Sequence, residues 1–224
     1  MPHRAHLRAR AAVVLAAAFL TVGHLTAQSA DTALTRFFQS YLDEAFALRP
    51  LDATRLGDHR FDHLLDDVSA PARARWQEHT RHTLEALPRE VDYARLSRDG
   101  QVDFEILRHE LAKSLWLAEN TRPFEEDPRV YNDYLSDSVF LLLAQSSLPR
   151  ETNVAHVIAR LAQMPRVITA ARENLRTPPR THTETAIRQN RGAIAFYERD
   201  LFALAGETRQ LEALKQAAAP VVAA

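Results

Sequence analysis

The amino-acid sequence predicts an all-α protein, an antiparallel array of several helices, and three observations lead to this fold class. Only four glycines follow position 27, and the chain has no Asn-Gly pair of the kind that favours tight β-hairpin turns. Apolar residues do not alternate with polar ones but recur every three or four positions, which is the spacing of one helix face. A content of 46% hydrophobic and 25% charged residues is typical of globular proteins and excludes a wholly disordered chain.

The first 27 residues have the pattern of a secretory signal peptide. Three arginines and no acidic residue precede an apolar run over residues 11–20, which is shorter than the roughly 20 residues that span a bilayer. We therefore expect cleavage after Ala27, export to the periplasm or the extracellular space, and no stable membrane insertion. An uncleaved membrane anchor is the alternative. Cleavage would change the formal net charge from −1 to −4, and neither value provides the basic surface of a nucleic-acid-binding protein.

Residues 28–224 are expected to form a single helical domain. Its first part is predicted to contain a helix over residues 31–49, a short turn to Gly57 and a loop over residues 58–68. A second helix over residues 69–87 and a long third helix over residues 97–120 follow. Side chains that cap or interrupt helices mark these borders: Asp31, Thr32, Pro50, Ser69, Pro88 and Ser97.

The rest of the chain is also predicted to be helical, after a proline-containing loop over residues 121–132. A buried helical segment is expected over residues 139–144, followed by a helix that starts at Thr152 or Asn153 and is interrupted at Met164-Pro165. A last long helix is expected to start at Thr181 or Thr183 and to end at Gly206, and a further helix begins near Glu207. The final stretch, residues 217–224, is apolar and uncapped. We therefore expect the chain to be a fragment of a longer gene product, with a frayed tail as the alternative.

Several kinds of catalytic site are excluded by the sequence. The absence of cysteine excludes disulfides, thiol catalysis and zinc–cysteine sites. The stretch His109–Lys113 begins like the zinc motif His-Glu-x-x-His, but its fifth residue is a lysine, which is a poor metal ligand. His79 and His82 are expected on a solvated helix face. No nucleophile elbow, phosphate-binding glycine loop or dinucleotide fingerprint is present.

The segment Gly57–His63 is the first candidate site. His59 and His63 are four residues apart, so on a helix they could bind a metal ion together with Asp58 or Asp62. Gly57 favours a loop instead, and no third ligand group is evident. Three interpretations stay open: a metal site, a functional loop, and a structural turn built on hydrogen bonds between aspartate side chains and the backbone.

A second candidate is the polar group Arg188-Gln189-Asn190-Arg191-Gly192 inside an otherwise apolar helix. Arg188 and Arg191 are three residues apart and could bind one carboxylate or phosphate. A glycine in the middle of a helix costs about 1 kcal/mol relative to alanine, so Gly192 should have a packing or ligand-binding reason. The group is interpreted either as part of a ligand-facing cleft or as a hydrogen-bond cluster between helices.

Three stretches occur in an order and spacing that together carry a family resemblance. The first is Tyr41–Glu44 followed by Pro50–Asp62, the second is Leu96–Asp103, and the third runs from Met164-Pro165-Arg166 through Ala171–Leu175 to Pro178-Pro179. Together they resemble the N-terminal half of the bacterial family catalogued as domain of unknown function 885. The resemblance covers essentially all of the chain after the predicted cleavage point.

The resemblance implies a function for the full-length protein and a separate role for the part that this chain represents. Members of that family are long, exported, mostly helical proteins, similar in architecture to zincin-type peptidases, with a zinc pattern His-Glu-x-x-Pro-Gly-His-His in their C-terminal half. This sequence has no such stretch, so the resemblance implies zinc for the full-length protein but no catalytic residue, metal ligand or cofactor in this chain. It implies that the following side chains line a substrate cleft: Asp58, His59, Arg60, Asp62, Arg188, Asn190 and Arg191.

Two functions follow from these expectations. In the first, the chain is the non-catalytic N-terminal portion of an exported, zincin-like and peptidase-like hydrolase. Its partners would be the C-terminal half of the same protein and a peptide substrate. In the second, the chain is a stand-alone periplasmic helical binding module without catalytic activity.

Overall fold

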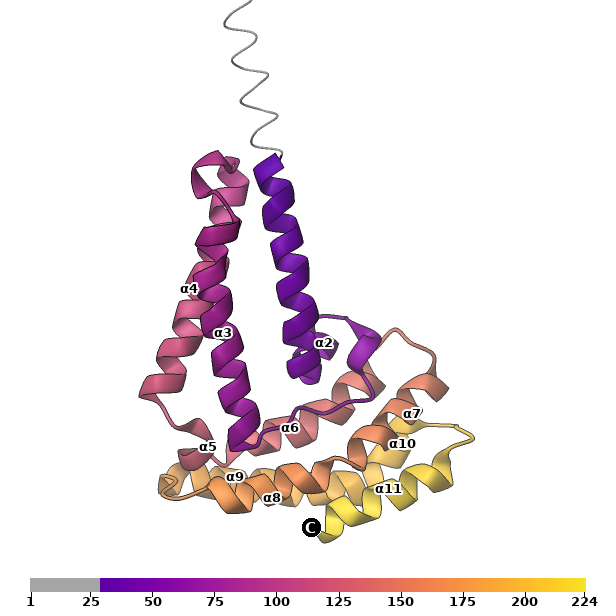
Figure 1. Ribbon diagram of the computed structural model, residues 1–224. Coiled ribbons are helices and arrows are strands. Elements are labelled where there is room, and N and C mark those ends of the chain that lie inside the picture. The colour runs from indigo at the N-terminus through magenta and orange to yellow at the C-terminus, as the bar shows by residue number, and fades with distance from the viewer. Residues whose placement is uncertain (1–28) are drawn as a thin grey trace, which may run out of the picture. The chain divides into compact units, whose positions relative to one another are not determined.

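The computed structural model describes residues 29–224, and these residues form helices joined by short loops, with no β-strand among them (Figure 1). This confirms the all-α prediction. The predicted signal peptide, residues 1–27, lies outside the described residues. The described chain divides into two compact units, and the expectation of a single domain stays a prediction. Unit 1 contains residues 29–42 and Glu78–Leu117, and unit 2 contains Asp43–Gln77 and Ala118–Ala224.

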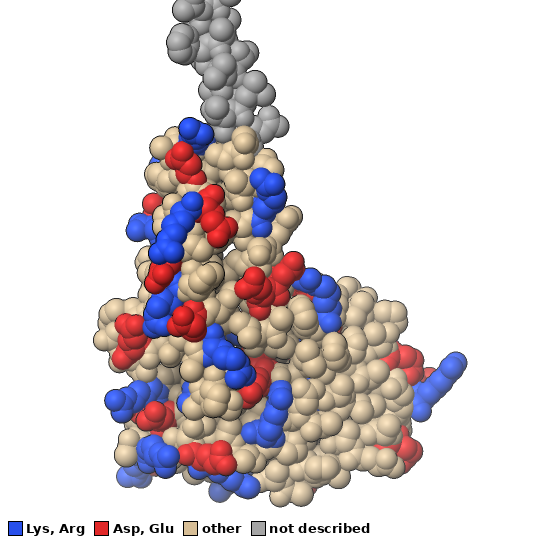
Figure 2. Space-filling model, in the orientation of Figure 1, with Lys and Arg blue, Asp and Glu red and all other residues tan. Residues whose placement is uncertain are grey.

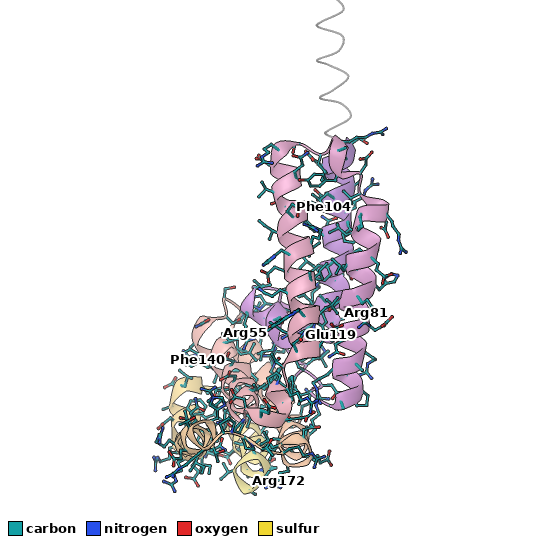
Figure 3. All side chains as sticks on the ribbon, turned by 90° about the vertical axis from the view of Figure 1, so that its left-hand side faces the viewer. Arg55, Arg81, Phe104, Glu119, Phe140 and Arg172 are labelled. Atoms are coloured by element: carbon teal, nitrogen blue, oxygen red, sulfur yellow. The ribbon has the colours of Figure 1, made fainter. Side chains whose placement is uncertain are left out.

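Unit 1 is built from three helices that pack on one apolar core. They are the N-terminal helix of residues 29–48, of which residues 29–42 belong to unit 1, the larger part of α3 (Ala70–Glu90) and most of α4 (Arg98–Asn120). A short 3-10 helix, Tyr93–Arg95, joins α3 to α4. Phe104 of α4 lies between the helices (Figure 3), and the other core side chains include Leu34, Leu87, Val91, Leu96, Leu107 and Leu111.

The borders of these helices correct two predictions. The first helix is already formed at residue 29, so Asp31 does not cap it; its carboxylate accepts a hydrogen bond from the backbone N–H of Ser97 at 3.0 Å. Ser97 caps α4 as predicted, because its hydroxyl accepts from the backbone N–H of Gly100 at 3.1 Å. Pro88 does not end α3, which continues to Glu90, because a proline near the last turn removes few of the helix's hydrogen bonds.

Unit 2 contains all the other helices. After α2 (Pro50–Arg55) and a 3-10 turn (His59–Phe61) come α5 (Pro123–Glu126), α6 (Arg129–Phe140), α7 (Arg150–Leu161) and α8 (Met164–Asn174). They are followed by α9 (Arg180–Ala195), α10 (Leu201–Ala205) and α11 (Leu211–Ala223). Two π-helical turns, Leu141–Gln145 and Phe196–Asp200, extend α6 and α9. Figure 1 shows α8 and α9 lying along α6.

The predicted loop over residues 121–132 is wrong in part, because it contains α5 and the start of α6. Pro123 occupies the first turn of α5, where the missing N–H of proline costs little, so this proline starts a helix rather than interrupting one. Met164-Pro165 does separate α7 from α8, and Gly206 ends α10 with a φ of 64°, both as predicted.

The apolar C-terminal stretch is part of the core of unit 2 and is not frayed. It forms the second half of α11, in which Ala218 and Val221 are buried together with Leu214. These side chains belong to one apolar cluster with Val154, Val157 and Leu201. On the face drawn in Figure 2, charged side chains gather over α3, whereas a broad area of unit 2 near α7 and α11 carries few.

A membrane-spanning candidate is absent from the helices of residues 29–224, since none of them combines sufficient length with sufficient apolar content.

Candidate functional site

The loop after α2 is held in one conformation by its own side chains. Gly57 has a φ of 82°, which side-chain-bearing residues rarely adopt, and it turns the chain away from α2. Asp58 then accepts a hydrogen bond from the backbone N–H of Arg60 at 3.0 Å and so caps the 3-10 turn. The guanidinium of Arg60 binds both carboxylate oxygens of Asp58 and also pairs with Asp43 at 2.7 Å.

Asp62 is the centre of a buried polar cluster below this loop. Its carboxylate is fully buried and accepts a hydrogen bond from the hydroxyl of Thr54 and one from Nδ1 of His59, each at 2.7 Å. Nδ1 of His156 lies 3.8 Å from the same oxygen that His59 binds. The burial of this carboxyl group is accommodated because both of its oxygens have hydrogen-bond partners.

Arg160 of α7 completes the cluster from the other side. Its buried guanidinium donates to the backbone carbonyls of Leu64 and Ser138 at 2.9 and 3.0 Å and to the hydroxyl of Thr54 at 2.5 Å. Nη2 lies 3.9 Å from Oδ1 of Asp62. Burial lowers the pKa of Arg160 to about 10, with the nearby carboxylates opposing that shift, so the side chain remains charged at neutral pH.

Two histidines, His59 and His156, lie beside the buried carboxylate, and His63 lies beside His156. About a quarter of the His59 side chain, 26%, is exposed, and its Nδ1 is engaged by Asp62, so the Nε2 side of the ring is free to meet another molecule. The rings of His63 and His156 have centroids 6.3 Å apart. Burial lowers the pKa of His156, which is therefore neutral at pH 7.

The geometry of the loop can be compared with the three interpretations of residues 57–63. His59 lies in a 3-10 turn and His63 follows that turn, so the two do not share an α-helical face. Among the described residues, no group of three or more histidine, cysteine, aspartate or glutamate side chains is arranged to hold a metal ion. Asp58 forms the predicted aspartate–backbone turn, whereas Asp62 and His59 form a buried acid–imidazole pair.

The structure places the second candidate group elsewhere in unit 2. Arg188 and Arg191 are exposed on α9, and Arg188 donates to the hydroxyl of Thr185 at 3.2 Å. Within residues 29–224, no hydrogen bond or ion pair joins Arg188, Asn190 or Arg191 to the Asp58–Asp62 loop, so their common role in one cleft stays a prediction. Asn190 lies at an apolar cavity.

Comparison with known proteins identifies the family. The family model described as "Bacterial protein of unknown function (DUF885)" matches residues 50–224. The chain belongs to this family. A solved structure described as "a putative lipoprotein of unknown function" from Shewanella oneidensis is similar in fold, with a TM-score of 0.74 and 22% sequence identity. The similarity covers 85% of this chain but only 35% of the other. No curated protein matches the chain significantly.

In this DUF885 chain, sequence reasoning missed three members of the Asp62 cluster: Thr54, His156 and Arg160. One signal was available, because Arg160 lies on the apolar side of its helix, between Val157 and Leu161. A charged residue at such a position requires buried partners. The partners themselves could not be found from spacing, since Leu64 is 96 residues away in the sequence.

Proposed function

We propose that this chain is the non-catalytic N-terminal helical portion of a longer, exported, zincin-like protein of the family. When complete, that protein is a peptidase-like hydrolase whose zinc site lies outside this chain. The observation that carries the proposal is the unequal coverage in the structural comparison. Most of this chain, 85%, aligns with only 35% of the Shewanella oneidensis protein, so a relative with this fold has a much longer chain.

The Asp58–Asp62 loop is the part of the chain proposed to meet a peptide substrate. The pair of Asp58 with Arg60 fixes the outer turn, and the buried pair of Asp62 with His59 fixes the imidazole. A ring held through Nδ1 can donate or accept a hydrogen bond through Nε2 without an additional entropic cost of orientation. In this role the chain positions a peptide group and performs no bond cleavage.

The size and location of the protein in cells test this proposal. An antibody raised against a peptide from the exposed side of α4 should detect an exported polypeptide much larger than 25.3 kDa. Osmotic-shock fractionation should release it with periplasmic marker proteins, and a cytoplasmic marker should stay with the cells. A single band at or just below 25.3 kDa would contradict the proposal.

A stand-alone binding module is the second candidate, and one observation favours it. Unit 2 contains an apolar cavity of about 380 Å³, within the size range of small-molecule sites. A stand-alone module would be the only product that the antibody detects. The same fractionation experiment therefore separates the two candidates.

A further inference from the structure

The apolar cavity of unit 2 lies among α6, α8, α9 and α11. Its volume is about 380 Å³, near the lower end of the range of about 300–1,000 Å³ found for small-molecule sites. Four positions of the α9 segment line it at helical spacing: Asn190, Ala193, Ile194 and Tyr197. The other walls come from α6, α8 and α11, so residues from well-separated parts of the sequence line the space.

Apart from Asn190 and Arg172, the walls offer rings and aliphatic groups rather than free polar atoms. The hydroxyl of Tyr131 donates to the carbonyl of Phe124 at 2.8 Å, and that of Tyr197 donates to the carbonyl of Leu135 at 2.6 Å. The side-chain amide of Asn132 donates to the carbonyl of Ala186 and to the side chain of Gln189. Since these polar groups already have partners, the cavity favours an apolar guest.

Tyr197 reaches the cavity from an unusual backbone segment. It lies in the π-helical turn Phe196–Asp200, and such turns occur frequently at functional sites. Burial raises the pKa of its hydroxyl far above the usual value, so this wall is uncharged at every physiological pH.

A cation stands at the edge of the cavity. Arg172 of α8 lines it, is exposed, and lies on the side of unit 2 where α8 and α11 meet (Figure 3). Its Nη2 donates to the carbonyl of Ala224, which leaves other guanidinium N–H groups available. Among the described residues, no acidic side chain forms an ion pair with Arg172. An anionic group at the mouth would meet this charge.

We propose that this cavity binds a small amphipathic carboxylate, with an aliphatic chain among Tyr131, Ala193 and Tyr197 and its carboxylate at Arg172. The apolar walls select the chain, and the guanidinium of Arg172, through the N–H groups that do not bind Ala224, selects the acid over a neutral analogue. The volume of about 380 Å³ fits a small molecule rather than a partner helix, which needs a long groove. The site is separate from the Asp62 cluster and does not depend on the function proposed above.

Calorimetric titration of the purified chain with decanoate, and with decanol as the neutral analogue, tests this inference. Decanoate should bind saturably, one molecule per chain, and Ala193→Phe should weaken it at least about tenfold by filling the cavity. Ala203→Phe adds the same ring at an exposed position of α10 and should leave binding unchanged. Arg172→Gln should weaken decanoate at least about fivefold but leave decanol unchanged.

Further results decide between the cavity and other binding modes. If circular dichroism shows that Ala193→Phe does not fold, Ala171→Phe takes the place of this variant, because it fills the same cavity from α8. The proposal is wrong if decanoate does not saturate, if several molecules bind per chain, or if both cavity-filling variants bind it as the parent does. Sedimentation without ligand provides a further test: a dimer that Ala193→Phe dissociates would show that a second copy of the chain occupies this face.

Discussion

The buried carboxylate of Asp66 accepts a hydrogen bond from the backbone N–H of Leu51 at 2.8 Å. The N-cap residue of α2, Arg49, makes no capping hydrogen bond with its side chain. Asp66, from the loop after α2, instead binds one of the free N–H groups in the first turn of this helix. The guanidinium of Arg49 is 4.0 Å from this carboxylate and lies over the ring of Trp76. Burial nevertheless dominates and raises the pKa of Asp66 to about 6.

This raised pKa predicts how stability depends on pH. An aspartate in an unfolded chain has a pKa of about 3.9, so between about pH 4 and pH 6 folded Asp66 keeps a proton that the unfolded chain has released. The free energy of unfolding therefore falls as the pH rises through this window. Asp66→Asn keeps an acceptor for Leu51 and should raise the free energy of unfolding by about 1–3 kcal/mol at neutral pH, with little effect at about pH 4.

Urea unfolding at both pH values measures this difference. Trp76 belongs to unit 2 and Trp116 to unit 1, so fluorescence of a Trp116→Phe background reports on unit 2. Asp103→Asn, at an exposed position of α4, is the control and should show no such pH-dependent gain. An Asp66→Asn variant that is less stable than the parent at neutral pH would show that the charged carboxylate stabilises α2.

The Asp62 cluster predicts a large loss of stability when Arg160 is replaced. Arg160→Met leaves the carbonyls of Leu64 and Ser138 without their donor and removes the cation nearest to Asp62. Breaking one partner of a buried ionic group costs about 3–5 kcal/mol, and we expect a loss of this size in urea unfolding. Arg199→Met makes the same change at an exposed position and should cost less than about 0.5 kcal/mol. Equal effects of the two variants would contradict a structural role for the cluster.

Gly192 and Gly206 should respond in opposite ways to alanine. A Cβ at Gly192 would meet no atom within 4 Å, so packing does not require glycine there, and Gly192→Ala should stabilise the chain by up to about 1 kcal/mol. Gly206 has a φ of 64° and a ψ of −152°, a region open almost only to glycine, and a Cβ would collide with Arg150. Gly206→Ala should therefore destabilise by more than about 1 kcal/mol. Thermal unfolding of both variants checks this, and a destabilising Gly192→Ala would show that unit 2 needs a glycine there.

Local signals explain which parts of the fold could be predicted from the sequence. Ser97, Gly206 and the Met164-Pro165 pair act on their own turn of the chain, so their helix borders were predicted correctly. Two errors concern prolines, Pro88 and Pro123, which lie inside or at the start of a helix instead of interrupting it. Another arose where a residue acts on a distant segment. Asp31 looked like a cap for its own helix, but its carboxylate binds the backbone N–H of Ser97, 66 residues later.

In the candidate site too, contacts between near neighbours in the sequence could be predicted, whereas contacts between distant segments could not. Asp58 as a turn-forming residue follows from its position next to Gly57, because the bond to the N–H of Arg60 spans two residues. The hydrogen bonds of Arg160 to Leu64 in the loop and to Thr54 join residues 96 and 106 positions apart, and no periodicity of the sequence predicts them. Asn190 was singled out for its polar neighbours, whereas its notable feature is a position at an apolar cavity formed by four helices.

We propose that this chain positions a substrate and supports the rest of the protein but performs no hydrolysis of its own. Incubating the purified chain with a mixed library of fluorogenic peptides and added zinc tests this claim most directly. The account predicts no cleavage above that of buffer, and the same result for His59→Ala. Cleavage by the parent chain that a single substitution such as His59→Ala abolishes would contradict it.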